Sequence, residues 1–212
     1  MSPDYVPYSN RVKVSFAGDS ITVGNFATAY GGYRFDLINY LTSYYGYIPN
    51  IVGKDYYNSY SYACMGASGI TSGTLHSSYT GSEASTYTPS IVFMLIGSND
   101  AASSVPTNTY VANVNLCLDD FRTAVPTCHV FISGSIDRTG FTSTITTYNA
   151  SLLTSIQARN DYANGYVHYV DQYTALGVST GPNFADGIHP SQQVGYSVMA
   201  TTWYNSFRTV FI

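Results

Sequence analysis

The sequence predicts an α/β protein, a three-layer α/β/α sandwich around a five-stranded parallel, flavodoxin-like sheet. Two observations support this prediction. Short apolar, β-branched runs alternate along the chain with longer stretches whose apolar residues recur at helical spacing. The most apolar run, 91–96, contains no polar residue, which is typical of a strand covered by helices on both faces. Because crossovers between parallel strands are right-handed, few topologies remain.

Five runs of this kind are expected to form the sheet: 12–17, 48–52, 91–96, 130–133 and 167–170. The run 91–96 is predicted to lie at the centre. Pro49 cannot donate a ladder hydrogen bond, so the second run is expected at an edge.

Four stretches have helical periodicity and are predicted to be helices: 33–44, 107–124, 142–162 and 191–207. In the first of them, Leu37, Ile38 and Leu41 lie on one stripe, and a following glycine can end the helix. The segment 56–89 is different, because it is rich in Ser, Thr, Tyr and Gly and has little periodicity. We expect it to be irregular surface that forms one wall of a cleft.

The composition fits a single domain, 1–212, with residues 1–10 as an N-terminal extension. Charged residues make up only 9 %, against about 25 % in an average soluble protein. With a net charge of −4 and no Lys/Arg cluster, no nucleic-acid partner is expected. No apolar run approaches the roughly 18 residues that span a membrane. The hydroxyl-rich composition favours an extracellular or virion-associated protein. Since residues 1–10 do not resemble a signal peptide, a removed leader or another export route is expected.

Three cysteines cannot all pair within one chain. Cys117 and Cys128 can meet, which would leave Cys64 free, or all three are small buried thiols. No Cys/His spacing resembles a zinc site, and no metal or cofactor is implied.

The segment Gly18–Gly24 (GDSITVG) places Ser20 where a buried strand ends and a helix can begin. A serine hydroxyl becomes a good nucleophile when a base takes its proton. The backbone N–H of Ser20 is expected to point into the same cleft, as helix-terminal amides do. Asp19 is expected to hold the turn by bonding to the backbone. The alternative is an ordinary serine N-cap.

Asp186 and His189 stand three residues apart in a segment with Gly and Pro. Such a turn lets the carboxylate fix one imidazole nitrogen while the other faces the serine, so His189 can act as base and then acid. The alternative is a surface turn. His129 and His168 fall at strands and are expected to be structural. His76 lies in the irregular wall, where it can contact substrate, but no acid is expected beside it.

Asn99 follows the central run, at the sheet edge where parallel-sheet proteins bind ligands. Its amide can donate to an oxyanion, and losing one such donor typically lowers the rate about 10²–10³-fold. Gly69 lets a backbone N–H approach a substrate closely. The alternatives are a helix-capping Asn and an ordinary Gly-Ser loop. A Gly-x-Ser-x-Gly elbow is absent, which disfavours the α/β-hydrolase fold.

From Val12 to about Phe207 the chain resembles the SGNH (GDSL-type) hydrolases. Four blocks carry the resemblance: Gly18–Thr22, Ser68–Gly69, Gly97–Asp100 and Asp186–His189. The resemblance implies that Ser20 is the nucleophile and that Asp186 and His189 complete a triad. It also implies that Gly69, Asn99 and the Ser20 amide form the oxyanion hole.

A finer resemblance, through Gly31–Arg34 and Ile51–Gly53, is to the carbohydrate-esterase branch, although Cys64–Gly69 departs from its pattern. It implies removal of O-acetyl groups from a polysaccharide. Four tyrosines of the expected wall can stack on sugar rings: Tyr56, Tyr57, Tyr60 and Tyr79. The alternatives are a broad lipolytic esterase or thioesterase, and a glycan-binding module of a phage tail or cell surface.

Overall fold

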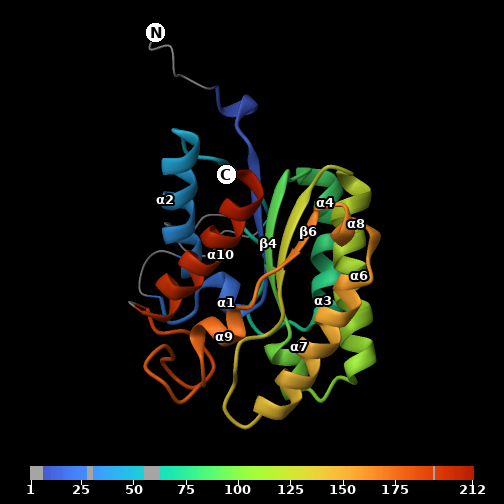
Figure 1. Ribbon diagram of the computed structural model, residues 1–212, viewed down its shortest axis with the longest axis vertical. Coiled ribbons are helices and arrows are strands. Elements are labelled where there is room, and N and C mark those ends of the chain that lie inside the picture. The colour runs from blue at the N-terminus through green and yellow to red at the C-terminus, as the bar shows by residue number, and fades with distance from the viewer. Residues whose placement is uncertain (1–6, 28–30, 55–62, 193) are drawn as a thin grey trace.

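The computed structural model describes residues 7–27, 31–54, 63–192 and 194–212. Within these residues a parallel sheet separates two layers of helices (Figure 1). The strand order is β2-β1-β4-β5-β6, and β3 pairs with the end of β1. The strands are β1 (Lys13–Gly18), β2 (Asn50–Ile51), β3 (Met65–Gly66), β4 (Ile91–Leu95), β5 (His129–Ser133) and β6 (Val167–Tyr169). The five predicted runs form the flavodoxin-like order, with the second at an edge, so the predicted fold class is confirmed. The two-residue strand β3 is an addition to it.

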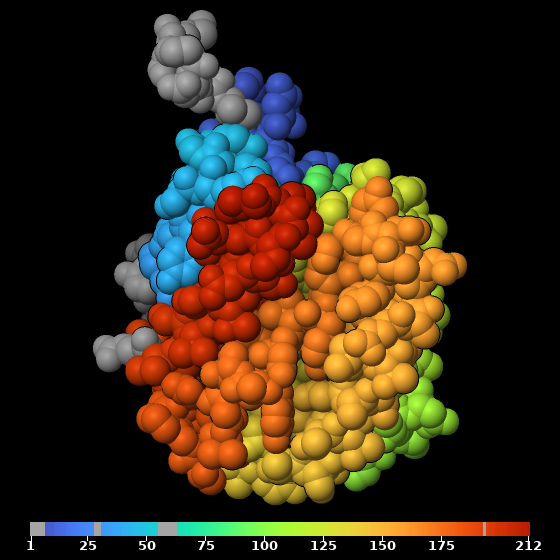
Figure 2. All heavy atoms as spheres, in the orientation of Figure 1, coloured from blue at the N-terminus to red at the C-terminus, as the bar shows by residue number. Residues whose placement is uncertain are grey.

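Helices cover both faces of the sheet (Figure 1). On one side lie α1 (Ser20–Val23), α2 (Tyr33–Tyr45), α9 (Gln172–Leu176) and α10 (Gly195–Phe211). On the other lie α3 (Ser72–Leu75), the π-helical turn η2 (His76–Thr80), α4 (Gly81–Tyr87), α5 (Ser98–Ala102), α6 (Thr107–Ala124), α7 (Thr142–Gln157) and α8 (Asn160–Ala163). A short 3₁₀ turn, Tyr8–Asn10, precedes β1. Helices α2 and α10 pack side by side at the surface (Figure 2).

The central strand β4 is buried on both faces, as its apolar composition predicted. Ile91, Phe93 and Leu95 pack beneath α2 and α10. Val92 and Met94 point to the opposite face, beneath α6 and α7. This alternation follows from the two-residue period of a strand.

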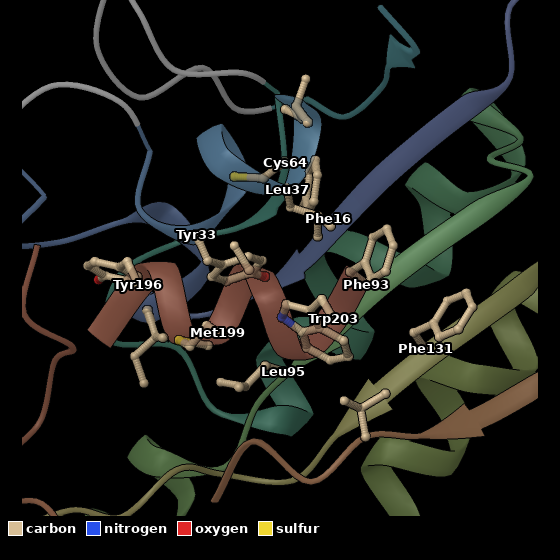
Figure 3. Packing of buried hydrophobic residues seen from close by; sticks show 14 of the residues in the cluster. Phe16, Tyr33, Leu37, Cys64, Phe93, Leu95, Phe131, Tyr196, Met199 and Trp203 are labelled. Carbon is tan, nitrogen blue, oxygen red and sulfur yellow. The ribbon is translucent and has the colours of Figure 1, made fainter. Parts of the chain in front are cut away.

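A row of aromatic rings crosses the sheet beneath α10 (Figure 3). Phe16 lies opposite Phe93 in the strand register, and Phe93 lies opposite Phe131. Their rings stack with centroids 5.8 and 5.2 Å apart, and Trp203 of α10 meets Phe93 edge-on at 5.6 Å. Such pairs contribute about 0.5–1.5 kcal/mol each beyond the area they bury. The row fixes α10 over the sheet.

The prediction of irregular structure over 56–89 is wrong for residues 72–87. Residues 72–87 form a continuous helical segment through α3, η2 and α4. Its buried apolar residues, Leu75 and Ala84, are too sparse among Ser, Thr and Gly to produce a visible apolar stripe. Residues 55–62, which include Tyr56, Tyr57 and Tyr60, lie outside the described residues.

Two predicted helix boundaries also differ. The stretch 142–162 divides into α7 and α8, because Arg159 is extended where its guanidinium binds the carboxylate of Asp161 at 2.8 Å. The last helix begins at Gly195 and not at Ser191. The Ser191 N–H donates to Asn183 O at 2.7 Å, so this residue belongs to the preceding loop.

The three cysteines are buried thiols that form no disulfide. In the described ranges no group of three or more His, Cys, Asp and Glu side chains is arranged to hold a metal ion. None of the helices described is both long enough and apolar enough to span a bilayer.

Candidate active site

The turn that carries Ser20 begins at a glycine. Gly18 ends β1 with a φ of +155°. A Cβ there would lie 2.2 Å from the Leu95 carbonyl oxygen of β4 and 2.4 Å from Thr22 Oγ1 of α1. Only a residue without a side chain lets the strand turn so close to both neighbours. Ser20 then becomes the first residue of α1, at the carboxyl end of the sheet (Figure 1).

The structure brings the three predicted triad residues together from opposite ends of the chain. Ser20 Oγ lies 2.9 Å from His189 Nε2. His189 Nδ1 lies 2.9 Å from Asp186 Oδ2. These are hydrogen-bond distances, so a proton can pass from the serine hydroxyl to the imidazole while the carboxylate orients the ring.

The Asp186 carboxylate holds its own turn as well as the imidazole. Its Oδ1 accepts from the N–H groups of Ile188 at 2.9 Å and His189 at 2.7 Å. Burial raises the pKa of Asp186, but the hydrogen bonds from the His189 amide, the His189 ring and the Ile188 amide outweigh it. The pKa therefore lies below its ordinary value and the group is a carboxylate at neutral pH. A carboxylate at this position holds the proton on Nδ1 and leaves the Nε2 lone pair toward Ser20.

The predicted oxyanion donors lie on two loops that touch each other. Asn99 is in the first turn of α5, and its Nδ2 donates to Ile70 O at 3.0 Å. Ile70 directly follows Gly69, whose φ of +82° is a conformation that residues with a side chain rarely adopt. Among the described residues no atom lies within 4 Å of where a Gly69 Cβ would be, so the loop is open on that side. The Asn99 side chain thus sits against the segment that carries the Gly69 amide.

A buried hydrogen-bonded pair fixes this arrangement from behind. The Asp100 carboxylate accepts from the Ser72 N–H at 2.9 and 3.1 Å and from Ser72 Oγ at 2.5 Å. Asn113 of α6 also donates to Ser72 Oγ, at 3.3 Å. Consecutive residues of α5 therefore hold both Ile70 and Ser72, so the Gly69 loop is bound on its C-terminal side. Sequence reasoning missed this clamp, because nothing in the local pattern links positions 72 and 100.

Asp19 is a fully buried acid beneath the serine. Its Oδ1 accepts from the Ile21 N–H at 3.0 Å, as the turn predicted, and its Oδ2 lies 3.5 Å from Asn99 Nδ2. Burial is the largest cause of a raised pKa at Asp19, and the negative charge of Asp100 raises the pKa further. The hydrogen bond from the Ile21 N–H and the positive charge of Arg138 lower it. The resulting pKa is about 7.

The segment 31–34, which carried the finer resemblance, supports α1 from below. Arg34 is fully buried and donates to Val23 O at 2.9 Å and to Gly31 O at 3.2 Å. Tyr33 Oη and Thr22 Oγ1 share a hydrogen bond of 3.1 Å. These contacts join the start of α2 to the helix that begins with the serine.

The other histidines lie elsewhere. His76 does have an acid beside it, contrary to expectation: its Nδ1 is 2.9 Å from Asp120 Oδ2, a partner 44 residues away in the chain. His129 and His168 stack with Nδ1 and Nε2 3.2 Å apart, and His129 begins β5, at the end of the strand opposite to the triad. Burial lowers the pKa of His168 to about 4. Tyr79, expected in a cleft wall, packs against the core.

The segment after α1 forms a border of the site that sequence reasoning also missed. Asn25 Oδ1 accepts from Ser68 Oγ at 3.2 Å, and Asn25 O accepts from Tyr196 Oη at 2.6 Å. The Phe26 ring lies against His189, with centroids 5.0 Å apart and planes inclined by 32°.

Comparison with solved structures finds chains of the same fold. A family 3 carbohydrate esterase from Clostridium thermocellum aligns with a TM-score of 0.76 at 24 % identity, over 94 % of this chain and 96 % of its own. One from Talaromyces cellulolyticus gives 0.74 at 21 %, over 93 % and 97 %. A catalytic mutant of an acetylxylan esterase from Geobacillus stearothermophilus gives 0.69 at 18 %, over 92 % and 93 %. No curated protein sequence matches.

The family assignment comes from the sequence. The family model for the GDSL-like lipase/acylhydrolase family matches residues 16–196, which include every predicted site residue. The matched segment runs from β1 into α10, the elements between which the triad forms. The chain therefore belongs to the GDSL-like lipase/acylhydrolase family and is an ester hydrolase.

Proposed function

We propose that this protein is a serine esterase that removes O-acetyl groups from a polysaccharide through an acyl-enzyme intermediate. The observation that carries the proposal is the row of two 2.9 Å hydrogen bonds from Ser20 Oγ through His189 to the Asp186 carboxylate. The carbohydrate part is supported by the similar structures, which include family 3 carbohydrate esterases and an acetylxylan esterase.

In the acylation step, Ser20 Oγ attacks the carbonyl carbon of the acetyl group and its proton moves to His189 Nε2. The carbonyl electron pair moves onto the oxygen, which becomes an oxyanion. The Ser20 and Gly69 amides and Asn99 Nδ2 are the donors that would stabilise this charge. Asn99 has two amide hydrogens; one donates to Ile70 O at 3.0 Å and the other makes a long contact of 3.5 Å with Asp19 Oδ2, which it would exchange for the oxyanion.

The tetrahedral intermediate collapses when its bond to the sugar oxygen breaks and His189 Nε2–H protonates that oxygen. The deacetylated sugar leaves, and the acetyl group remains on Ser20. Water, deprotonated by His189, then attacks the carbonyl carbon of the acetyl-serine. The bond to Ser20 Oγ breaks, His189 returns the proton to Oγ, and acetate is released. In both halves Asp186 stabilises the imidazolium, since its own low pKa keeps it ionised.

The test compares wild type with Ser20→Ala on acetylated xylan, on other acetylated glycans and on 4-nitrophenyl acetate and octanoate. We expect wild type to release acetate from at least one glycan and to cleave the acetyl ester faster than the octanoyl ester. Ser20→Ala should lose both the glycan and the nitrophenyl ester activity. Equal turnover of the two esters with no glycan cleaved would indicate a lipolytic esterase. Glycan binding that survives Ser20→Ala, without ester cleavage by wild type, would indicate a binding module.

A further inference from the structure

Phe26 combines three properties that are unusual together. It is a large apolar side chain with 58 % of its surface exposed. Its φ is +64°, in the left-handed region that favours glycine. Its ring lies 5.0 Å from the ring of His189. Strain of this kind costs on the order of 1–3 kcal/mol and persists where the surroundings impose it, often at functional sites.

The surroundings of Phe26 do impose its position. The preceding residue, Asn25, is held on both sides: its side chain by Ser68 of the Gly69 loop and its carbonyl by Tyr196 of α10. The Ala27 N–H donates to Gly24 O at 3.0 Å and closes a tight turn around the two residues. The phenyl ring is therefore presented to solvent at a fixed place beside the imidazole.

That place is defined by the chemistry of the leaving group. His189 Nε2 must protonate the oxygen of the departing alcohol, so this oxygen comes within hydrogen-bond distance of the imidazole. The carbon skeleton attached to that oxygen then lies next to the imidazole, on the side away from the acyl carbon. An exposed ring that already contacts the imidazole can meet this skeleton, whereas the acyl group lies toward Asn99 and Gly69.

We infer that Phe26 is a specificity-determining residue. The exposed face of its phenyl ring packs against the ring of the leaving alcohol, which is a pyranose in the natural substrate. The inference rests on the proposed function only for the identity of that ring. Aromatic faces pack on the C–H face of a saturated ring, and they are among the side chains that line small-molecule sites. Contacts of this strength correspond to about a three- to tenfold effect.

The test keeps the acyl group constant and varies the alcohol. Ethyl acetate, cyclohexyl acetate and a monoacetylated methyl xyloside are compared on wild type, Phe26→Ala, Phe26→Trp and Ile48→Ala. The alanine is as strained at this φ as the phenylalanine, so the comparison isolates the ring. Ile48 is a matched control, because it is an exposed apolar residue, at 50 %, between α2 and β2, at the end of the sheet opposite to the triad.

We expect Phe26→Ala to lower kcat/KM about three- to tenfold for the two ring alcohols and less than twofold for ethyl acetate. Phe26→Trp should retain wild-type selectivity, and Ile48→Ala should leave all three rates unchanged. Equal losses on all three esters, with a shifted pH profile, would show that Phe26 acts only through His189 and would overturn the inference. No loss on any ester by a folded variant would also overturn it.

The same experiment separates this inference from the proposed function. If wild type cleaves cyclohexyl acetate but not the acetylated xyloside or any acetylated glycan, the polysaccharide substrate is wrong. The ratio between the cyclohexyl and ethyl esters still decides the role of Phe26 in that case. Cleavage of these esters by Ser20→Ala at the wild-type rate would overturn both proposals, because Ser20 would then not be the nucleophile.

Discussion

The buried acid beneath the serine makes the stability of the protein depend on pH in an unusual direction. Asp19 is fully buried, and its pKa in the folded protein is about 7, against an ordinary value of 3.8. Between these two values the folded state binds more protons than the unfolded state. Stability is therefore highest at or below about pH 4 with respect to this group, and it falls as pH rises toward 7.

The magnitude follows from the two values. A change from 3.8 to about 7 corresponds to about 4 kcal/mol of lost stability once Asp19 is ionised in both states. Asp19→Asn keeps the shape and an oxygen for the Ile21 N–H but carries no charge. The new amide can change the stability by a constant amount at every pH. The free energy of unfolding of Asp19→Asn relative to that of wild type should nevertheless rise by about 2 kcal/mol between pH 5 and pH 7.

The measurement is urea unfolding of both proteins at intervals from pH 4.5 to 8.5, with free energies extrapolated to water. Ser20→Ala is the matched control, because it changes the neighbouring residue and leaves Asp19 in place, so it should follow the wild-type pH dependence. A stability difference between Asp19→Asn and wild type that stays constant over this range would refute the reasoning.

Three further predictions concern activity. Asn99→Ala should lower kcat about 10²–10³-fold with little change in KM, measured on 4-nitrophenyl acetate, because its amide acts on the developing oxyanion; a change confined to KM would contradict this. Asp186→Asn should lower kcat by up to about 10⁴-fold, since an amide cannot stabilise the imidazolium, and a pH–rate profile identical to wild type would argue against that role. Asp100→Ala should have a larger effect on kcat than on KM, because it breaks all three contacts to Ser72 and frees the Gly69 loop. It should also lower kcat more than Ser72→Ala does. If Asp100→Asn restores the thermal midpoint but not kcat, Asp100 positions the loop and does not act through folding alone.

Sequence reasoning succeeded where the information is local. The strands and long helices were visible because a period of 2 or 3.6 repeats over several residues, and Thr107–Ala124 was predicted to the residue. Ser20 and the Asp186–His189 pair were visible because each lies in a short segment whose turn residues fix its geometry. These patterns need no knowledge of what the chain packs against.

Apart from the two helix boundaries, which depend on nearby residues, the missed features depend on contacts between distant segments. Helix 72–87 is stabilised by its packing on α6, and its own sequence has few apolar residues. The hydrogen bonds of Ser72 with Asp100 span 28 residues and set the Gly69 loop. The conformation of Phe26 follows from bonds that Asn25 makes to the second block and to the last helix. Spacing in the sequence carries no signal for such partners.

The origin of the triad from the two ends of the chain has a consequence for folding. Ser20 and His189 are separated by 169 residues, and the loop they close includes nearly all of the sheet. Closing such a loop is entropically unfavourable until the intervening strands and helices have formed, and chains rich in such long-range contacts fold slowly. During refolding the far-ultraviolet helical signal should therefore recover before ester cleavage does. Ester cleavage requires the contact between Ser20 and His189, so the recovery of activity reports when this long-range contact has formed.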